Sequence, residues 1–73
     1  MVYYVKVLDI LMTKQTNILL VEDDASLSTV LADYLRSKNY TVETAPNGKE
    51  AWDLIMIKHY DLVISDIMMP RLN

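Results

Sequence analysis

Apolar and polar residues alternate along this chain with two different periods. Residues 18–21 and 62–65 are short apolar runs with polar neighbours, the pattern of buried strands in a parallel sheet. Residues 40–45 alternate enough to form a further strand between them, and helical spacing fills the two gaps. From residue 17 onward the chain therefore predicts strand, helix, strand, helix, strand, with parallel strands and right-handed crossovers.

The first predicted helix follows the acidic residues at 22–24. Its apolar residues fall at i, i+3, i+4, i+7 and i+8: Leu27, Val30, Leu31, Tyr34 and Leu35. Asp24 is placed to cap its start, and Arg36 and Lys38 lie in its last turn, where cations meet the negative end of the helix dipole. Asn39 is suited to the left-handed conformation that ends a helix.

The second predicted helix begins in a proline–asparagine–glycine turn and runs to about Lys58. Asn47 and Glu50 have the spacing of a capping box, with asparagine in place of serine or threonine. The helix is apolar nearly all round, and Ala51 and Ile55 are expected in the core. Three further apolar residues face either a partner or the missing half of the domain, a choice that the pattern leaves open: Leu54, Met56 and Ile57.

Carboxylates follow two of the predicted strands. Glu22, Asp23 and Asp24 come directly after the first strand, and Asp66 comes directly after the third. If the first strand lies between the other two, the ends of the first and third are about 4.8 Å apart, close enough for Asp23 and Asp66 to share a cation. Like charges gathered there would repel unless a hard divalent ion such as magnesium neutralised them. The competing interpretation of the acidic triplet is a solvated helix-capping loop, which suits Asp24 best.

Composition excludes several classes of protein. The chain has 73 residues, a net charge of −3 and no cysteine. Without a basic stripe this segment is not expected to contact nucleic acid, and without cysteine it has no disulfide framework or thiolate metal site. Its apolar runs are far shorter than a membrane span. These features fit a cytoplasmic domain.

The first residues do not fit the pattern of the rest. Residues 1–11 lack the basic start and cleavage site of a signal peptide, and Met12 opens a polar lead-in. We therefore expect residues 1–16 to be an extension, non-native or a mis-start, and residues 17–73 to form a partial domain. The competing interpretation is an added strand, because Tyr3, Val5 and Val7 alternate with their neighbours.

Three motifs, in this order and at this spacing, resemble the receiver domain of two-component response regulators. They are residues 18–24, residues 47–51 and residues 61–70, with the sequences ILLVEDD, NGKEA and DLVISDIMMP. The resemblance implies a flavodoxin-like, doubly wound α/β sheet with strand order 2-1-3, lacking the last two βα units. The third strand would then be an exposed apolar edge. The resemblance further implies that the chain is the amino-terminal part of a longer protein.

The resemblance also implies roles for individual residues. Asp66 corresponds to the aspartate that accepts a phosphoryl group from a histidine kinase. Glu22 and Asp23 correspond to the acidic pair that binds Mg²⁺, together with Asp66 and the backbone carbonyl of Met68. The family consists of signalling domains that promote their own phosphotransfer and dephosphorylation, and are not otherwise enzymes. Since it lacks the serine or threonine and the lysine of the later strands, this segment is not expected to switch alone.

The full-length protein implied by this resemblance is a cytoplasmic regulator. It most often controls transcription through a carboxy-terminal DNA-binding domain, and a homodimer of that protein is compatible with the resemblance.

Rival functions can be weighed against the same residues. A hydrolase of the haloacid dehalogenase type needs a second aspartate two positions after the first, where Met68 stands, and a nucleotide-binding loop needs more glycine than Gly48 alone. His59 is expected at the surface rather than as a phosphodonor. The serious alternative is a truncated α/β interaction module without phosphotransfer activity.

Overall fold

The computed structural model of the chain describes residues 2–5 and 15–65. Four strands and two helices are formed in these ranges: β1 (Val2–Val5), β2 (Asn17–Val21), α2 (Ala25–Ser37), β3 (Thr41–Ala45), α3 (Gly48–Ile57) and β4 (Leu62–Ser65). From β2 to β4 the elements follow the predicted order, and their boundaries lie within one residue of the predicted ones. Within the described ranges, neither helix is long and apolar enough to cross a membrane.

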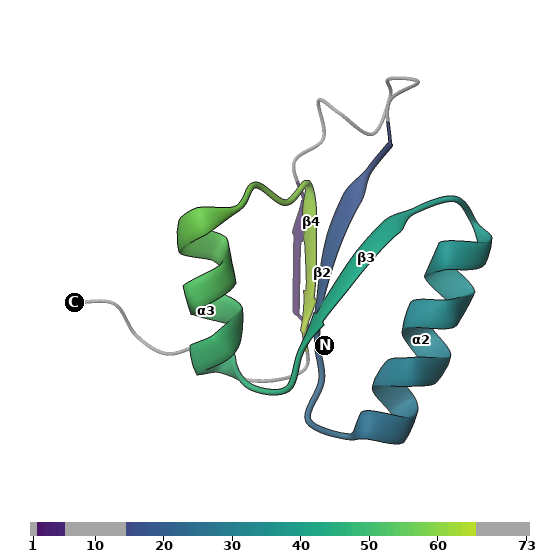
Figure 1. Cartoon of the computed structure of the whole chain (residues 1–73), viewed down its shortest axis with the longest axis horizontal. Helices are drawn as coiled ribbons and strands as arrows, with labels where there is room; N and C mark the ends of the chain where they lie inside the picture. The colour runs from purple at the N-terminus through teal and green to yellow at the C-terminus, as the bar shows by residue number, and fades with distance from the viewer. Residues whose placement is uncertain (1, 6–14, 66–73) are drawn as a thin grey trace.

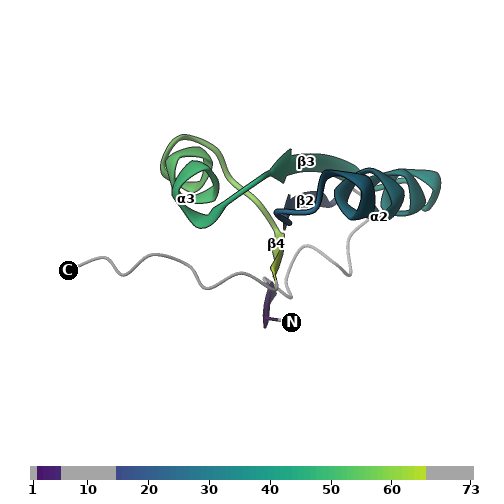
Figure 2. The ribbon, with the colours of Figure 1, turned by 90° about the horizontal axis from the view of Figure 1, so that it is seen from below.

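The strands form one sheet in the order β1-β4-β2-β3. β2 is parallel to both of its neighbours, β3 and β4, whereas β1 runs antiparallel to β4. The three parallel strands therefore have the predicted order, with the first of them in the centre. Figures 1 and 2 show α2 and α3 on opposite sides of the sheet, as a doubly wound arrangement requires.

Each helix closes its own apolar cluster, and β2 contributes to both. Ile18 and Leu20 pack in the cluster under α2, whereas Leu19 and Val21 pack in the cluster under α3. Successive side chains of a strand point to opposite faces, so a strand that is covered on both faces must be apolar throughout. This requirement explains why residues 18–21 form an unbroken apolar run.

The sheet-facing side of α2 differs from the predicted stripe. Ala32 is buried, and Leu31 and Leu35 pack beside it. Three residues of the predicted stripe are exposed instead, by 42%, 63% and 59% respectively: Leu27, Val30 and Tyr34. The predicted stripe is centred on the wrong residues because it was drawn through the large apolar side chains. The small Ala32 faces the sheet instead, and its size lets the helix pack closely on the strands.

Both helices begin at the predicted caps. The Asp24 carboxylate accepts a hydrogen bond from the Leu27 backbone N–H at 3.0 Å. The Asn47 side chain accepts one from the Glu50 N–H at 2.8 Å and donates one to the Glu50 carboxylate at 3.1 Å. At the far end of α2, Asn39 adopts the predicted left-handed conformation, with φ of 72°.

In α3, the residues that the pattern left open are divided between core and surface. Ala51 is fully buried, and Ile55 and Leu54 pack beside it in the cluster under the helix. Met56 and Ile57 are exposed. The prediction of Ala51 and Ile55 as core residues is confirmed.

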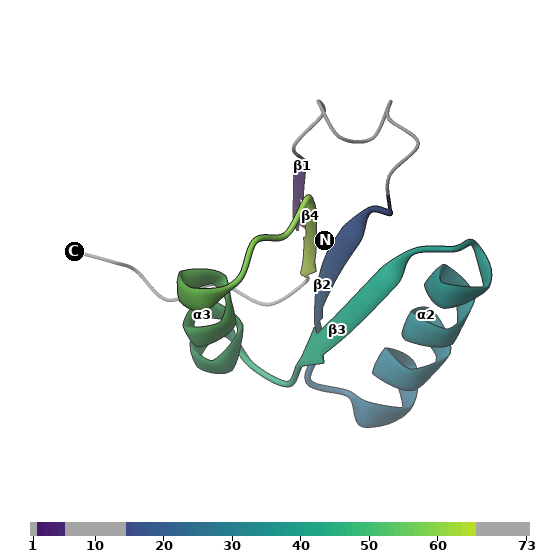
Figure 3. The ribbon, with the colours of Figure 1, turned by 45° about the horizontal axis from the view of Figure 1, so that its top comes forward.

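The edge of the sheet at β4 is covered, in contrast to the exposed edge that we expected. β1 pairs with β4 over four residues, from Val2 opposite Ser65 to Val5 opposite Leu62, and Figure 3 shows the two strands side by side. Residues 2–5 thus adopt the conformation of the added strand that the alternation in this segment allowed. That residues 1–16 form a non-native extension stays a prediction.

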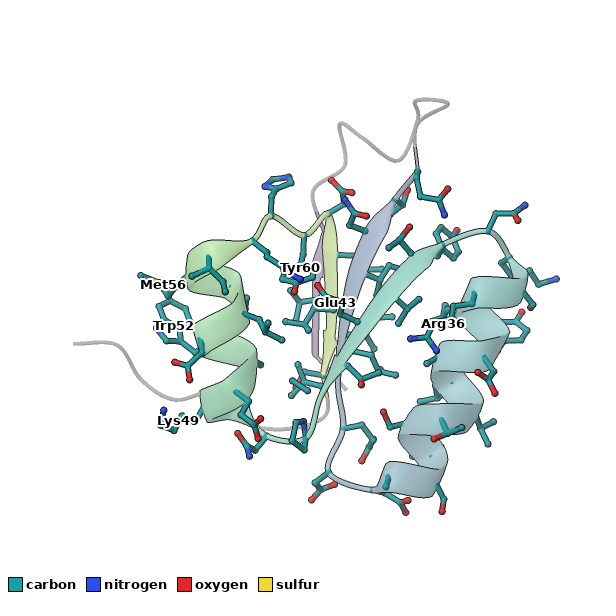
Figure 4. The ribbon with its side chains drawn as sticks, in the orientation of Figure 1. Arg36, Glu43, Lys49, Trp52, Met56 and Tyr60 are labelled. Atoms are coloured by element: carbon teal, nitrogen blue, oxygen red, sulfur yellow. The ribbon has the colours of Figure 1, made fainter. Side chains whose placement is uncertain are left out.

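A polar cluster fastens the end of α3 to β3. The Glu43 carboxylate on β3 accepts hydrogen bonds from Lys58 Nζ at 2.8 Å and from the Tyr60 hydroxyl at 2.6 Å, and Figure 4 shows Glu43 and Tyr60 close together between the strands and α3. The hydrogen bond from Lys58, followed by that from Tyr60, lowers the pKa of Glu43. Burial and the bond to Glu43 raise the pKa of Tyr60.

We expect Asn47→Ala to destabilise the chain by about 1 kcal/mol, because it removes the oxygen that satisfies the Glu50 N–H at the start of α3. Urea unfolding measures this change. Asn47→Asp keeps a capping oxygen and is the matched control. A loss of the same size in both variants would contradict the capping role.

The Glu43 cluster predicts a pH dependence of stability. Because the folded pKa of Glu43 lies below its ordinary value of 4.5, the cluster contributes fully above that value. Its contribution is lost as the pH falls through the lower folded pKa. Glu43→Gln should therefore lower the free energy of unfolding at neutral pH, and the difference from the parent should shrink in acid. Urea titrations across this range test the prediction, and a difference independent of pH would contradict it.

Candidate functional site

Two of the predicted site residues, Glu22 and Asp23, lie at the carboxyl end of the central strand. β2 ends at Val21, and the chain then passes through Glu22, Asp23 and Asp24 into α2. In the neighbouring strand, Ser65 is the register partner of Val21. The two strands therefore end level with each other. Asp66, the next residue in the sequence, lies outside the described residues, as does Met68.

Glu22 is fixed to the neighbouring strand and to its own loop. Its backbone N–H donates to the Ala45 carbonyl at the end of β3, at 3.0 Å. Its carboxylate accepts a hydrogen bond from the Asp24 N–H at 3.1 Å. The residue is only 6% exposed. Glu22 is thus a buried residue whose position is set by two backbone groups, the Ala45 carbonyl of β3 and the Asp24 N–H of its own loop.

Asp23 and Asp24 are exposed but differ in what they contact. The carboxylate of Asp24 caps α2 through the Leu27 N–H, as the sequence predicted. Asp23 carries the exposed carboxylate between this cap and buried Glu22. The loop therefore presents two carboxylates, those of Glu22 and Asp23, at the end of β2, while Asp24 holds the loop to the helix.

A shallow hollow of about 240 Å³ adjoins these carboxylates. Its polar lining consists of carboxylate and hydroxyl groups from the loop, α2 and β3: Glu22, Asp23, Ser28, Thr29 and Thr44. Among the described residues, the lining holds no sulfur or imidazole ligand, and oxygen donors of this kind suit a hard cation such as magnesium.

The described residues include only two of the four predicted metal ligands. Within residues 2–5 and 15–65, no group of three or more histidine, cysteine, aspartate or glutamate side chains could hold an ion. Glu22 and Asp23 are the two candidate ligands that the structure brings together. The two other predicted ligands, Asp66 and the Met68 carbonyl, remain predictions because both lie outside the described residues.

The sequence analysis did not identify Asp61 as a structural residue. Asp61 joins β2 and β4 at their amino ends, at the other end of the sheet from the acidic loop. Its carboxylate is buried and accepts a hydrogen bond from the Asn17 N–H at 2.8 Å, while its own N–H donates to the Asn17 carbonyl at 2.8 Å. His59 lies 3.5 Å from the same carboxylate and is exposed, as predicted. The signal available in the sequence was an aspartate directly before the apolar run of residues 62–65. This anchor sets the register that brings the two carboxyl ends level.

Comparison with known proteins agrees with this geometry. Residues 18–73 match the family described as response regulator receiver domain. The chain is 38% identical over 60 residues to the transcriptional regulatory protein RprY of Bacteroides fragilis, covering 82% of this chain and 25% of that protein. It is 43% identical over 58 residues to the response regulator ArlR of Staphylococcus epidermidis, with 80% and 26% covered.

A third relative, the transcriptional regulatory protein ResD of Bacillus subtilis, is 41% identical over 58 residues, with 80% of this chain and 24% of that protein covered. The chain thus spans about a quarter of the length of the curated relatives that it matches. The family match covers well over half of the chain, and the observed strand order is the one that the resemblance implied. This chain accordingly belongs to the family of response regulator receiver domains.

Proposed function

We propose that this chain is the phosphoacceptor part of a two-component response regulator, with Asp66 as the acceptor. The observation that carries the proposal is the register of β2 and β4. Val21 and Ser65 are register partners, so these two neighbouring strands end level. In the sequence, the acidic loop directly follows one of them and Asp66 directly follows the other. Family membership supports the same assignment.

The chemistry required of the acceptor is simple. A carboxylate oxygen of Asp66 attacks the phosphorus of a phosphohistidine. The bond from phosphorus to the imidazole nitrogen breaks, the electron pair stays on that nitrogen, and an acyl phosphate forms on the aspartate. The protein contributes mainly by positioning the groups and by stabilising charge on the transferred oxygens.

Glu22, Asp23, Asp66 and the Met68 carbonyl would hold Mg²⁺, which would neutralise charge on the phosphoryl oxygens. The donor chemistry at the end of β2 fits this ion, because the described ligands are all oxygens and the carboxylate of Glu22 is already held in place by the Asp24 N–H.

The proposal extends to the longer protein. Two of the relatives are named transcriptional regulatory proteins, and we propose that the protein regulates transcription through a DNA-binding domain elsewhere in its sequence. Its signalling partner would be a sensor histidine kinase, and its compartment the cytoplasm. Formation of a homodimer would belong to that longer protein.

A second candidate function is an interaction module without phosphotransfer. The exposed apolar residues of the helices favour it, because Leu27, Val30 and Tyr34 form one face of α2. On α3, Figure 4 shows Trp52 and Met56 pointing away from the sheet. Such patches are typical of protein contacts.

Phosphoryl labelling separates the two functions. Incubated with Mg²⁺ and acetyl phosphate, the chain should gain the mass of one phosphoryl group, and hydroxylamine should remove it because an acyl phosphate is labile to that nucleophile. Asp66→Asn should gain none. Asp24→Asn keeps the capping oxygen of α2 and should be labelled like the parent. Equal labelling of the parent and Asp66→Asn would refute the assignment of Asp66, and no labelling of a folded parent would favour the interaction module.

Magnesium affinity tests the acidic loop. Asp23→Asn should weaken Mg²⁺ binding at least about tenfold, since even the loss of a group that only supports a ligand has an effect of that order. Asp24→Asn is the adjacent matched control and should change the affinity little, because Asp24 caps the helix. Calorimetric titration with Mg²⁺ measures both. A larger loss in Asp24→Asn than in Asp23→Asn would contradict the assignment.

A further inference from the structure

The apolar pattern of β4 determines the face that each side chain takes, but it determines the register of the strand only in part. Leu62 and Ile64 pack in the cluster under α2, and Val63 packs in the cluster under α3. Because side chains alternate with a period of two, a slip by one residue would reverse these faces, whereas a slip by two would restore them. Such a slip would move the strand by about 6.6 Å. A further interaction must therefore exclude it.

The segment that precedes β4 supplies that interaction. Lys58 and Tyr60 both donate to the Glu43 carboxylate on β3. Asp61 bonds to Asn17 on β2. β3 is not a neighbour of β4, because β2 lies between them. The bonds to Glu43 therefore hold the segment against the sheet, whereas the bonds of Asp61 determine where β4 begins along β2.

Two hydrogen bonds hold Asp61 in this position. Its N–H donates to the Asn17 carbonyl and its carboxylate accepts from the Asn17 N–H, both at 2.8 Å, and the residue is only 1% exposed. A slip by two residues in either direction would break both bonds. The slip toward the carboxyl end of β2 would also place Asp61 opposite Leu19, in the apolar cluster under α3, where a carboxylate is strongly disfavoured. Asp61 thus excludes the slips that the apolar pattern tolerates.

The register of β4 in turn bears on the acidic loop. Val21 and Ser65 are register partners, and in the sequence Glu22 follows the first and Asp66 follows the second. A paired strand that moves along its neighbour moves at both ends, so a displacement at the amino end of β4 also displaces the position after Ser65. Catalysis of phosphoryl transfer consists mainly of positioning, and misplacement by about 1 Å can lower a rate about a hundredfold.

From these observations we infer that Asp61 is a positioning residue for phosphotransfer, which acts on Asp66 through the register of β4. The inference rests on the proposed function. Asp61 bonds to Asn17, at the opposite end of β2 from the acidic loop. Its replacement should therefore slow phosphorylation without removing any group that is proposed to bind Mg²⁺ or to accept the phosphoryl group.

Three variants separate positioning from stability. Asp61→Ala removes the acceptor of the Asn17 N–H. Asp61→Asn keeps a side-chain oxygen for that N–H and is the conservative rescue. Glu43→Gln weakens the bonds between the preceding segment and β3 without altering a bond between Asp61 and β2. It is therefore the control for a purely structural loss.

Labelling with acetyl phosphate at saturating Mg²⁺ is the first test, with rates expressed per folded molecule. Asp61→Ala should be labelled at least about tenfold more slowly than the parent, while Asp61→Asn and Glu43→Gln keep most of the parent's rate. Equal rates for Asp61→Ala and the parent would overturn the role of Asp61, as would an equal slowing in Glu43→Gln. A folded parent that takes no label would instead refute the proposed function on which the inference rests.

Cross-strand nuclear Overhauser effects are the second test, and they do not depend on phosphorylation. Leu19 is the register partner of both Glu43 and Val63, so its contacts with Glu43 are an internal control. In Asp61→Ala the effects between Leu19 and Val63 should weaken, and those between Leu19 and Glu43 should persist. Unchanged effects between Leu19 and Val63 would overturn the inference, whatever the labelling rate.

A variant on the donor side covers the case in which Asp61→Ala fails to fold. Asn17→Pro removes the N–H that the Asp61 carboxylate accepts, and proline is tolerated at the first residue of a strand. This variant should slow labelling and weaken the effects between Leu19 and Val63 in the same way. A folded Asn17→Pro that behaves like the parent in both measurements would overturn the inference.

Discussion

The placement of β2 between two parallel neighbours is the constraint on which the rest of the structure depends. Its four apolar residues, Ile18 to Val21, are buried on both faces, and each helix closes one of those faces. Burial of apolar surface is the dominant favourable contribution to folding, and this strand contributes to it on both of its faces. The carboxyl end of this strand also carries the acidic loop, so the same element supports stability and the candidate site.

Register connects this core to the site. Two hydrogen bonds join Asn17 and Asp61 at the amino ends of β2 and β4: the Asn17 N–H donates to the Asp61 carboxylate, and the Asp61 N–H donates to the Asn17 carbonyl. With that end fixed, and with Val21 opposite Ser65, the strands end at the same level. A shift of one residue would turn every side chain of β4 to the opposite face and would displace the position that follows Ser65. The anchor lies at the far end of the sheet from the carboxylates, yet it determines their neighbours.

The two outer strands of the parallel set, β3 and β4, differ in what lies along their edges. Arg36 donates a hydrogen bond to the Val42 carbonyl of β3, and Glu43 adds charge to that strand, whereas among the described residues β4 is paired with residues 2–5. Side-chain protection requires a polar residue within reach of the strand. β4 is apolar because both of its faces contribute to the clusters under α2 and α3.

The sequence by itself determined the elements, their order and the residues at the end of β2. Local physical chemistry explains this success: the apolar run of a strand buried on both faces, the capping oxygens of Asp24 and Asn47, and the left-handed tolerance of Asn39 act within a few residues. Family motifs added the expected strand order and the proposed roles of Asp23 and Asp66.

Only the tertiary structure decided three other features: that Ala32 rather than Leu27, Val30 or Tyr34 faces the sheet, that Asp61 anchors β2 to β4, and that residues 2–5 pair with β4. Each depends on a partner distant in the sequence. Periodicity ranks residues by their own hydrophobicity and spacing, and it contains no information about which distant backbone group is left to be satisfied or how closely a helix can approach.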